Sequence, residues 1–154
     1  MGVTTGEFEV ASVLPPAKMF QAAVLDADQL FPKIMSQAIK SAELIEGNGG
    51  DGSIRKVNLV EGDSYMKHKV DALDKEKFVY NYTIFEGDTL NGKFEKIVYE
   101  TKWESSPDGG SIFKSTVTFY TLPGFDVPGE NLINKAKEKT TVMVKTVEAY
   151  LQAN

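Results

Sequence analysis

The chain has 154 residues, a formal net charge of −5 and no cysteine. The absence of cysteine excludes disulfide bonds, thiolate metal ligands and cysteine nucleophiles and suits a reducing compartment, while the negative charge disfavours a protein that relies on phosphate contacts with nucleic acid. Because the chain also lacks a bilayer-spanning apolar run and a secretory signal pattern, we expect one domain over residues 1–154 that is cytoplasmic and monomeric, with no membrane partner.

The first part of the chain predicts a strand followed by two short helices. Residues 7–13 alternate roughly between apolar and polar side chains, as a half-buried strand does. A proline is tolerated at a helix start, so residues 16–24 predict a short helix. Asp26 or Asp28 then caps a second short helix that continues through residues 31–35, which requires Pro32 to lie in its first turn.

From residue 40 onward the pattern is that of an antiparallel meander. Short turns rich in glycine and aspartate separate segments with period-two alternation, which favours hairpins over parallel units joined by helices. The predicted strands cover residues 41–46, 53–60, 65–73, 78–86, 93–105 and 111–121.

The end of the chain changes to a helical period. Apolar residues recur every three or four positions, which predicts one long amphipathic helix with a start signal at Pro128, Gly129 and Glu130. At ~1.5 Å per residue, such a helix spans roughly 30 Å and crosses a whole small domain. Its apolar stripe contains Leu132, Ile133, Ala136, Thr140, Met143, Val144, Val147, Tyr150 and Leu151.

The inward face of the predicted sheet combines apolar side chains with several hydroxyl groups. In residues 111–121, one parity carries Phe113, Ser115, Val117 and Phe119, while Lys114 has the opposite parity. Each buried hydroxyl group requires a hydrogen-bond partner, so a dry core has little use for many of them, whereas a ligand pocket does. The alternative is that the tyrosines bond to one another or reach the surface with their hydroxyl groups.

The most distinctive segment is a glycine-rich loop made of Gly47, Asn48, Gly49, Gly50, Asp51 and Gly52. It satisfies the spacing G-x-G-x-x-G, but the dinucleotide interpretation requires a helix after the last glycine, and residues 53–60 alternate as a strand. The segment also lacks the Gly-Lys-Ser/Thr ending of a Walker A loop. We therefore expect a hairpin loop whose glycines adopt positive φ angles.

This loop with its flanks, residues 46–54, resembles the glycine-rich loop of the pathogenesis-related class-ten family, whose members include the major birch pollen allergen. Further segments resemble the family in the same order along the whole chain: residues 15–20, 26–33, 67–69, 80–82, 107–112 and 147–151. The resemblance implies an α+β fold with a seven-stranded curved antiparallel sheet, a long C-terminal helix gripped by the sheet, two short helices in a V and an internal hydrophobic cavity.

The resemblance also implies a plant defence or stress protein that binds small amphipathic or apolar metabolites such as cytokinins, flavonoids, steroids and alkaloids. By family position, His68, Tyr80 and Tyr82 are the polar groups of the cavity. Arg55 either meets an acidic group of the ligand or pairs with a carboxylate of the protein. The ligand-contacting residues that we expect are Phe20, Arg55, Val57, Leu59, His68, Tyr80, Tyr82, Ile97, Tyr99, Ser115, Val117, Ala136 and Met143.

Two enzymatic alternatives belong to the same resemblance. A condensing enzyme of the norcoclaurine synthase type uses an inward lysine with nearby acids and a tyrosine, but Lys114 has the outward parity, which leaves Tyr99 and Glu95 as the residues to test. A ribonuclease activity is claimed for the family around the glycine loop with Glu148 and Tyr150, yet RNA cleavage requires a cationic phosphate site, which the net acidity disfavours. With one histidine and no cysteine, we expect no metal site. We also expect no cofactor and no catalytic residue.

Overall fold

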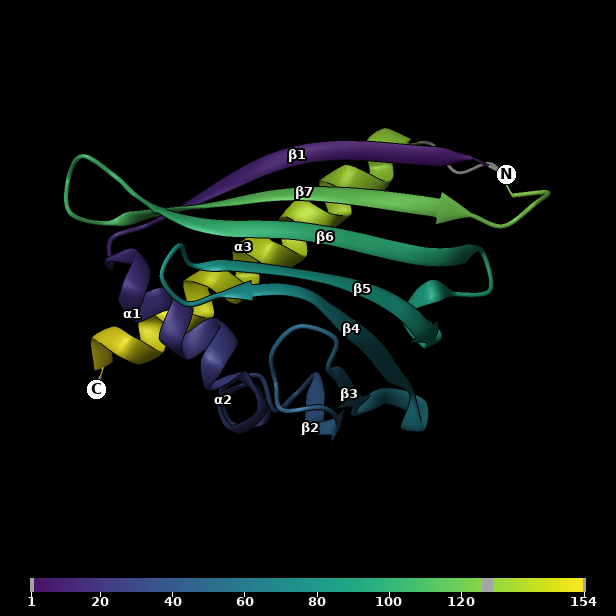
Figure 1. Cartoon of the computed structure of the whole chain (residues 1–154), viewed down its shortest axis with the longest axis horizontal. Coiled ribbons are helices and arrows are strands. Elements are labelled where there is room, and N and C mark those ends of the chain that lie inside the picture. The colour runs from purple at the N-terminus through teal and green to yellow at the C-terminus, as the bar shows by residue number, and fades with distance from the viewer. Residues whose placement is uncertain (1, 126–128, 154) are drawn as a thin grey trace.

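The computed structural model describes residues 2–125 and 129–153 and has the predicted α+β architecture. Seven antiparallel strands form one curved sheet in the order β1-β7-β6-β5-β4-β3-β2, so each strand after β1 lies beside its neighbour in the chain (Figure 1). The strands are β1 (Val3–Ser12), β2 (Ile39–Glu46), β3 (Ile54–Leu59), β4 (Tyr65–Asp74), β5 (Val79–Gly87), β6 (Phe94–Ser105) and β7 (Ser111–Thr121).

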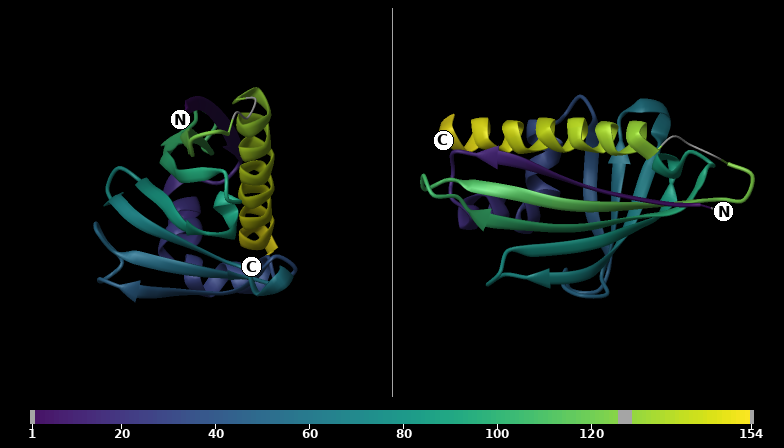
Figure 2. Two further views of the ribbon diagram at one scale, coloured as in Figure 1. Left: turned by 90° about the vertical axis from the view of Figure 1, so that its right-hand side faces the viewer. Right: turned by 90° about the horizontal axis from the view of Figure 1, so that it is seen from above.

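One long helix, α3 (Gly129–Ala153), lies across the sheet, as its apolar period predicts. The predicted start signal at Pro128 lies outside the described residues. Two views at right angles show α3 running nearly along β1 and β7, with the strands from β5 to β2 curving away from it (Figure 2). Its most extensive packing is against β1. The helix therefore covers one half of the concave face more closely than the other.

The two predicted short helices are present with altered boundaries. The first is divided into α1 (Pro16–Phe20) and a π-helical segment η1 (Gln21–Leu25), and the second, α2, covers Ala27–Ile34. Pro32 lies inside α2 and not in its first turn, which corrects our expectation. Proline cannot donate to the carbonyl four residues earlier, and α2 ends two residues beyond it. Two short 3-10 segments, η2 (Glu61–Asp63) and η3 (Asp88–Leu90), connect strands.

The alternation in β7 is the clearest confirmed prediction of the sheet. Phe113, Ser115, Val117 and Phe119 are all buried, whereas Lys114 is exposed. The strand β1 is longer than predicted because it continues backward to Val3 along β7. Irregular register between β2 and β3, β4 and β5, and β6 and β7 bends the sheet.

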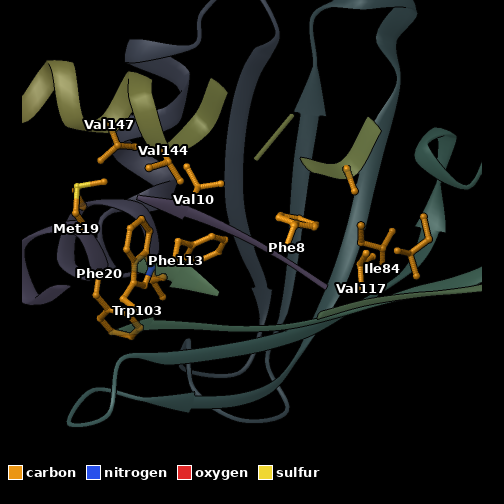
Figure 3. Packing of buried hydrophobic residues seen from close by; sticks show 14 of the residues in the cluster. Phe8, Val10, Met19, Phe20, Ile84, Trp103, Phe113, Val117, Val144 and Val147 are labelled. Atoms are coloured by element: carbon orange, nitrogen blue, oxygen red, sulfur yellow. The ribbon is translucent and has the colours of Figure 1, made fainter. Parts of the chain in front are cut away.

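A close-packed core fills the space between α1, the C-terminal half of α3 and strands β6 and β7 (Figure 3). Val144 and Val147 project from α3 toward Met19 of α1, and all three are fully buried. The single tryptophan, Trp103, stands against Phe113 with a distance of 4.5 Å between ring centroids. These side chains exclude solvent from this part of the interior.

Candidate functional site

A pocket of about 310 Å³ opens between α2 and the inner face of strands β2 to β6, where the sheet has curved away from α3. Pockets of this size accommodate small organic molecules. The inner surface of this pocket is predominantly apolar. It is lined by Ala23, Val24, Ala27, Asp28, Phe31, Met35, Ile39, Ala42, Arg55, Val57, Met66, His68, Tyr80, Tyr82, Thr101, Trp103, Phe113 and Met143.

The space depends on short side chains at the pocket wall. Ala23 and Ala27 come from the helical segments, and Ala42 comes from the facing strand β2. Alternate residues of a strand share one face, so Arg55 and Val57 of β3 point to the same side. The side chain of Met143 closes the pocket from α3.

The charged groups of the pocket form an ion pair between two elements that lie far apart in the chain. Nη1 of Arg55, on β3, donates to Oδ2 of Asp28, on α2. Their side chains are 14% and 29% exposed, so the pair is largely shielded from solvent. Of the two roles that the sequence left open for Arg55, the structure contains the ion pair with a carboxylate.

His68, on β4, lies directly opposite Arg55 in the register of β3 and β4. Its Nε2 atom is 2.8 Å from the hydroxyl oxygen of Tyr80, on β5. Burial, reinforced by the charge of Arg55, lowers the pKa of His68 to about 4. The imidazole is therefore neutral at physiological pH, and the net charge of the residues that line the pocket is zero.

Three tyrosines continue from His68 as a stack of rings along the inner face. The ring centroids of Tyr80 and Tyr82 are 5.2 Å apart, and those of Tyr82 and Tyr99 are 5.1 Å apart with nearly parallel planes. Burial raises the pKa of Tyr80 and of Tyr99 to about 12 and raises that of Tyr82 well above its usual range. All three hydroxyl groups are therefore protonated at neutral pH.

The structure brings together part of the predicted set of site residues. Six line the pocket: Arg55, Val57, His68, Tyr80, Tyr82 and Met143. Seven belong to the surrounding core or to the strands beside it: Phe20, Leu59, Ile97, Tyr99, Ser115, Val117 and Ala136. Whether any of them contacts a ligand stays a prediction.

Several lining residues were missing from the predicted set. Trp103 shares the inward parity of β6 with Ile97 and Tyr99, so parity alone would have found it, whereas Ala42 lies on β2, which carried no predicted site residue. Phe31 and Asp28 lie on α2, and nothing in the sequence fixes which face of that helix meets the sheet. Phe125, in the segment after β7, is 43% exposed and is not among the residues that line the pocket.

The glycine loop is a hairpin connection with positive φ angles at Gly47, Gly49 and Gly52, and a strand follows it, as predicted. The hydroxyl group of Ser53 accepts a hydrogen bond of 2.8 Å from the backbone of Gly49. The carboxylate of Asp51 accepts another, also of 2.8 Å, from the backbone of Leu73. These contacts brace the loop against β4, outside the pocket lining.

Of the residues named for the two enzymatic alternatives, Lys114, Glu148 and Tyr150 are not among the lining residues, whereas Tyr99 stacks on Tyr82, which lines the pocket. Lys114 pairs with Glu9 and Glu104 on the outer face of the sheet. Glu148 accepts a hydrogen bond from the backbone of Val13, and the hydroxyl group of Tyr150 accepts one from Lys33.

No group of three or more histidine, cysteine, aspartate or glutamate side chains that could hold a metal ion occurs among the described residues. Within the same residues, no helix is sufficiently long and apolar to span a bilayer.

Comparison with known proteins agrees with this architecture. The model of the pathogenesis-related protein Bet v 1 family matches residues 1–154. The major strawberry allergen Fra a 1-2 of Fragaria ananassa is 51% identical over 156 residues, covering 100% of this chain and 97% of the relative. The major allergen Pru av 1 of Prunus avium is 47% identical over the same shares.

Solved structures show the same fold. The crystal structure of Ara h 8.0201 has a TM-score of 0.89 and 44% identity, covering 99% of this chain and 100% of the other. The norcoclaurine synthase of Thalictrum flavum, in complex with dopamine and hydroxybenzaldehyde, has a TM-score of 0.76 at 14% identity, over 99% and 88% of the two chains. At that identity the likeness concerns the fold alone.

Proposed function

Since the chain belongs to the pathogenesis-related protein Bet v 1 family, we propose that it binds or carries small amphipathic metabolites in the pocket between α2 and the sheet. The observation that carries the proposal is the apolar pocket of about 310 Å³ with a few convergent polar groups, among them His68 and Tyr80. Apolar walls favour ligand binding through the hydrophobic effect, and the polar groups orient the ligand.

The proposal extends to a defence or stress role, a cytoplasmic location and a monomeric state. The lack of cysteine supports a reducing compartment. The candidate ligands are the classes that the family resemblance implies: cytokinins, flavonoids, steroids and alkaloids. We assign no enzymatic reaction, because Lys114 pairs with Glu9 and Glu104 on the outer face of the sheet and is not among the lining residues.

The test uses aminoanthracene, a neutral fluorescent probe. We expect micromolar binding to the wild-type protein, and displacement by at least one cytokinin, flavonoid or steroid. The single tryptophan lines the pocket, so its emission provides an independent report of occupancy.

A pocket-filling variant locates the binding. Ala42→Phe places a ring in the space between β2 and α2, and we expect at least a tenfold loss of probe affinity. Ala11→Phe is the matched control, because Ala11 is an exposed residue of β1 outside the lining. Equal affinities of the two variants, or no binding of the probe or of any competitor to the wild-type protein, would refute the proposal.

A further inference from the structure

The pocket contains an ion pair, and a ligand preference inferred from it rests on the proposed function. Asp28 and Arg55 are the charged residues among those that line it, and they face each other from α2 and β3. Both side chains are largely shielded from solvent. The histidine beside them is neutral, so no unpaired positive charge is available to a bound anion.

A carboxylate that enters this pocket loses its hydration, which costs several kcal/mol unless a counter-ion offsets it. Nη1 of Arg55 already donates to the carboxylate of Asp28. An incoming anion near Arg55 therefore also lies near the carboxylate of Asp28, and the repulsion from one cancels the attraction to the other. An uncharged ligand of the same shape does not incur either cost.

We propose that the Arg55–Asp28 pair makes the pocket selective for uncharged amphipathic ligands, and that Asp28 is the specificity-determining residue that excludes acids. Repulsive elements of this kind are a common source of specificity. The pair also connects α2 to the sheet, so the same contact closes one side of the pocket and sets its charge preference. Removal of the carboxylate at residue 28 converts Arg55 into a free site for an acid.

The experiment compares two probes of nearly the same shape, anthracenemethanol and anthracene carboxylate, at neutral pH. We expect the wild-type protein to bind the alcohol at least tenfold more tightly than the carboxylate. In Asp28→Asn, the affinity for the carboxylate should rise at least tenfold, because a charge-assisted hydrogen bond to Arg55 becomes available. The ratio of carboxylate affinity to alcohol affinity should therefore rise at least tenfold relative to the wild-type protein.

Asp26→Asn is the matched control. Asp26 immediately precedes α2, is exposed and accepts a hydrogen bond from Gln21, but it does not line the pocket. Both variants change the net charge of the protein equally, so a general electrostatic effect would raise carboxylate binding in both. The double variant Asp28→Asn/Arg55→Gln should lose the gain, since the gain depends on Arg55.

The outcomes separate the two proposals. Equal binding of both probes by the wild-type protein, or equal behaviour of Asp28→Asn and Asp26→Asn, overturns the selectivity while leaving ligand binding intact. Failure of both probes to bind the wild-type protein and every variant overturns the proposed function, and the selectivity with it. Should Asp28→Asn fail to fold, Asp28→Ser is the second variant, with the same expectation for the carboxylate.

Discussion

The only histidine of the chain couples the pocket to the pH dependence of folding. Burial and the charge of Arg55 lower the pKa of His68 from 6.5 to about 4 in the native protein. Between these two values, the unfolded chain holds a proton that the native protein does not. Stability therefore falls as the pH is lowered through this window, and the contribution of His68 is fully present above pH 6.5.

The perturbation that isolates this contribution is His68→Gln, which removes the titrating group and keeps a polar side chain of similar size. The pKa of His68 is about 2.5 lower in the native protein than in the unfolded chain, and one pKa unit corresponds to ~1.36 kcal/mol. The resulting change in the free energy of unfolding is roughly 3 kcal/mol. We expect the wild-type protein to lose about this much more stability than the variant between neutral pH and about pH 4. Urea denaturation, followed by tryptophan fluorescence at a series of pH values, measures the difference.

Carboxylates also titrate in this range, but they do so in both proteins. Asp74, Asp108 and Glu86 have lowered pKa values and contribute equally to the two curves. The difference between wild type and variant is therefore specific to residue 68. Parallel stability curves, or a native imidazole resonance that titrates near pH 6.5 in NMR, would show that the ring is not desolvated as the structure indicates.

Two further predictions concern the packing of α3. Val144→Ala should lower the free energy of unfolding by about 2 kcal/mol because Val144 is fully buried. Val142 lies on the same helix and is 56% exposed, so Val142→Ala should change the free energy of unfolding by less than ~0.5 kcal/mol. Equal losses in the two variants would mean that α3 is rotated differently about its axis. Gly6→Ala places a methyl group 2.6 Å from the side chain of Ile133, so we expect the free energy of unfolding, measured by thermal or urea denaturation, to fall by ~1–3 kcal/mol. An unchanged free energy of unfolding would mean that α3 lies farther from β1.

Most of the sheet and the long helix were accessible from the sequence because their periods are regular. The alternation from Phe113 to Phe119 identifies the inner face of β7, and the stripe through Val144 and Val147 identifies the buried side of α3. The π-helical segment Gln21–Leu25 was not accessible in this way. A widened turn costs backbone hydrogen-bond geometry and is selected by tertiary packing, here the burial of Ala22 and Val24, which local propensity does not encode.

The pocket was predicted less completely than the fold. Parity states that Arg55, Val57 and Val117 all face inward, but it does not state which of them meets space and which meets α3. Val117 is fully buried and does not line the pocket, while Arg55 and Val57 do. The sequence also did not identify the ion-pair partner of Arg55. Asp28 precedes Arg55 by 27 residues and approaches it only because α2 packs against β2.

The difference between the solid and the hollow halves of the interior follows from where α3 can come close to the sheet. Gly6 removes a side chain from β1 at the point where Ile133 packs, so α3 lies tightly against this edge. The sheet then curves away toward β2 (Figure 2), and the widening space is bordered by Ala23, Ala27 and Ala42, whose methyl groups do not fill it. Larger residues at these positions would replace the pocket with ordinary core. Small residues on both walls of a widening space, together with a glycine where the helix and the sheet meet, are therefore a physical basis for a stable domain that keeps an interior space.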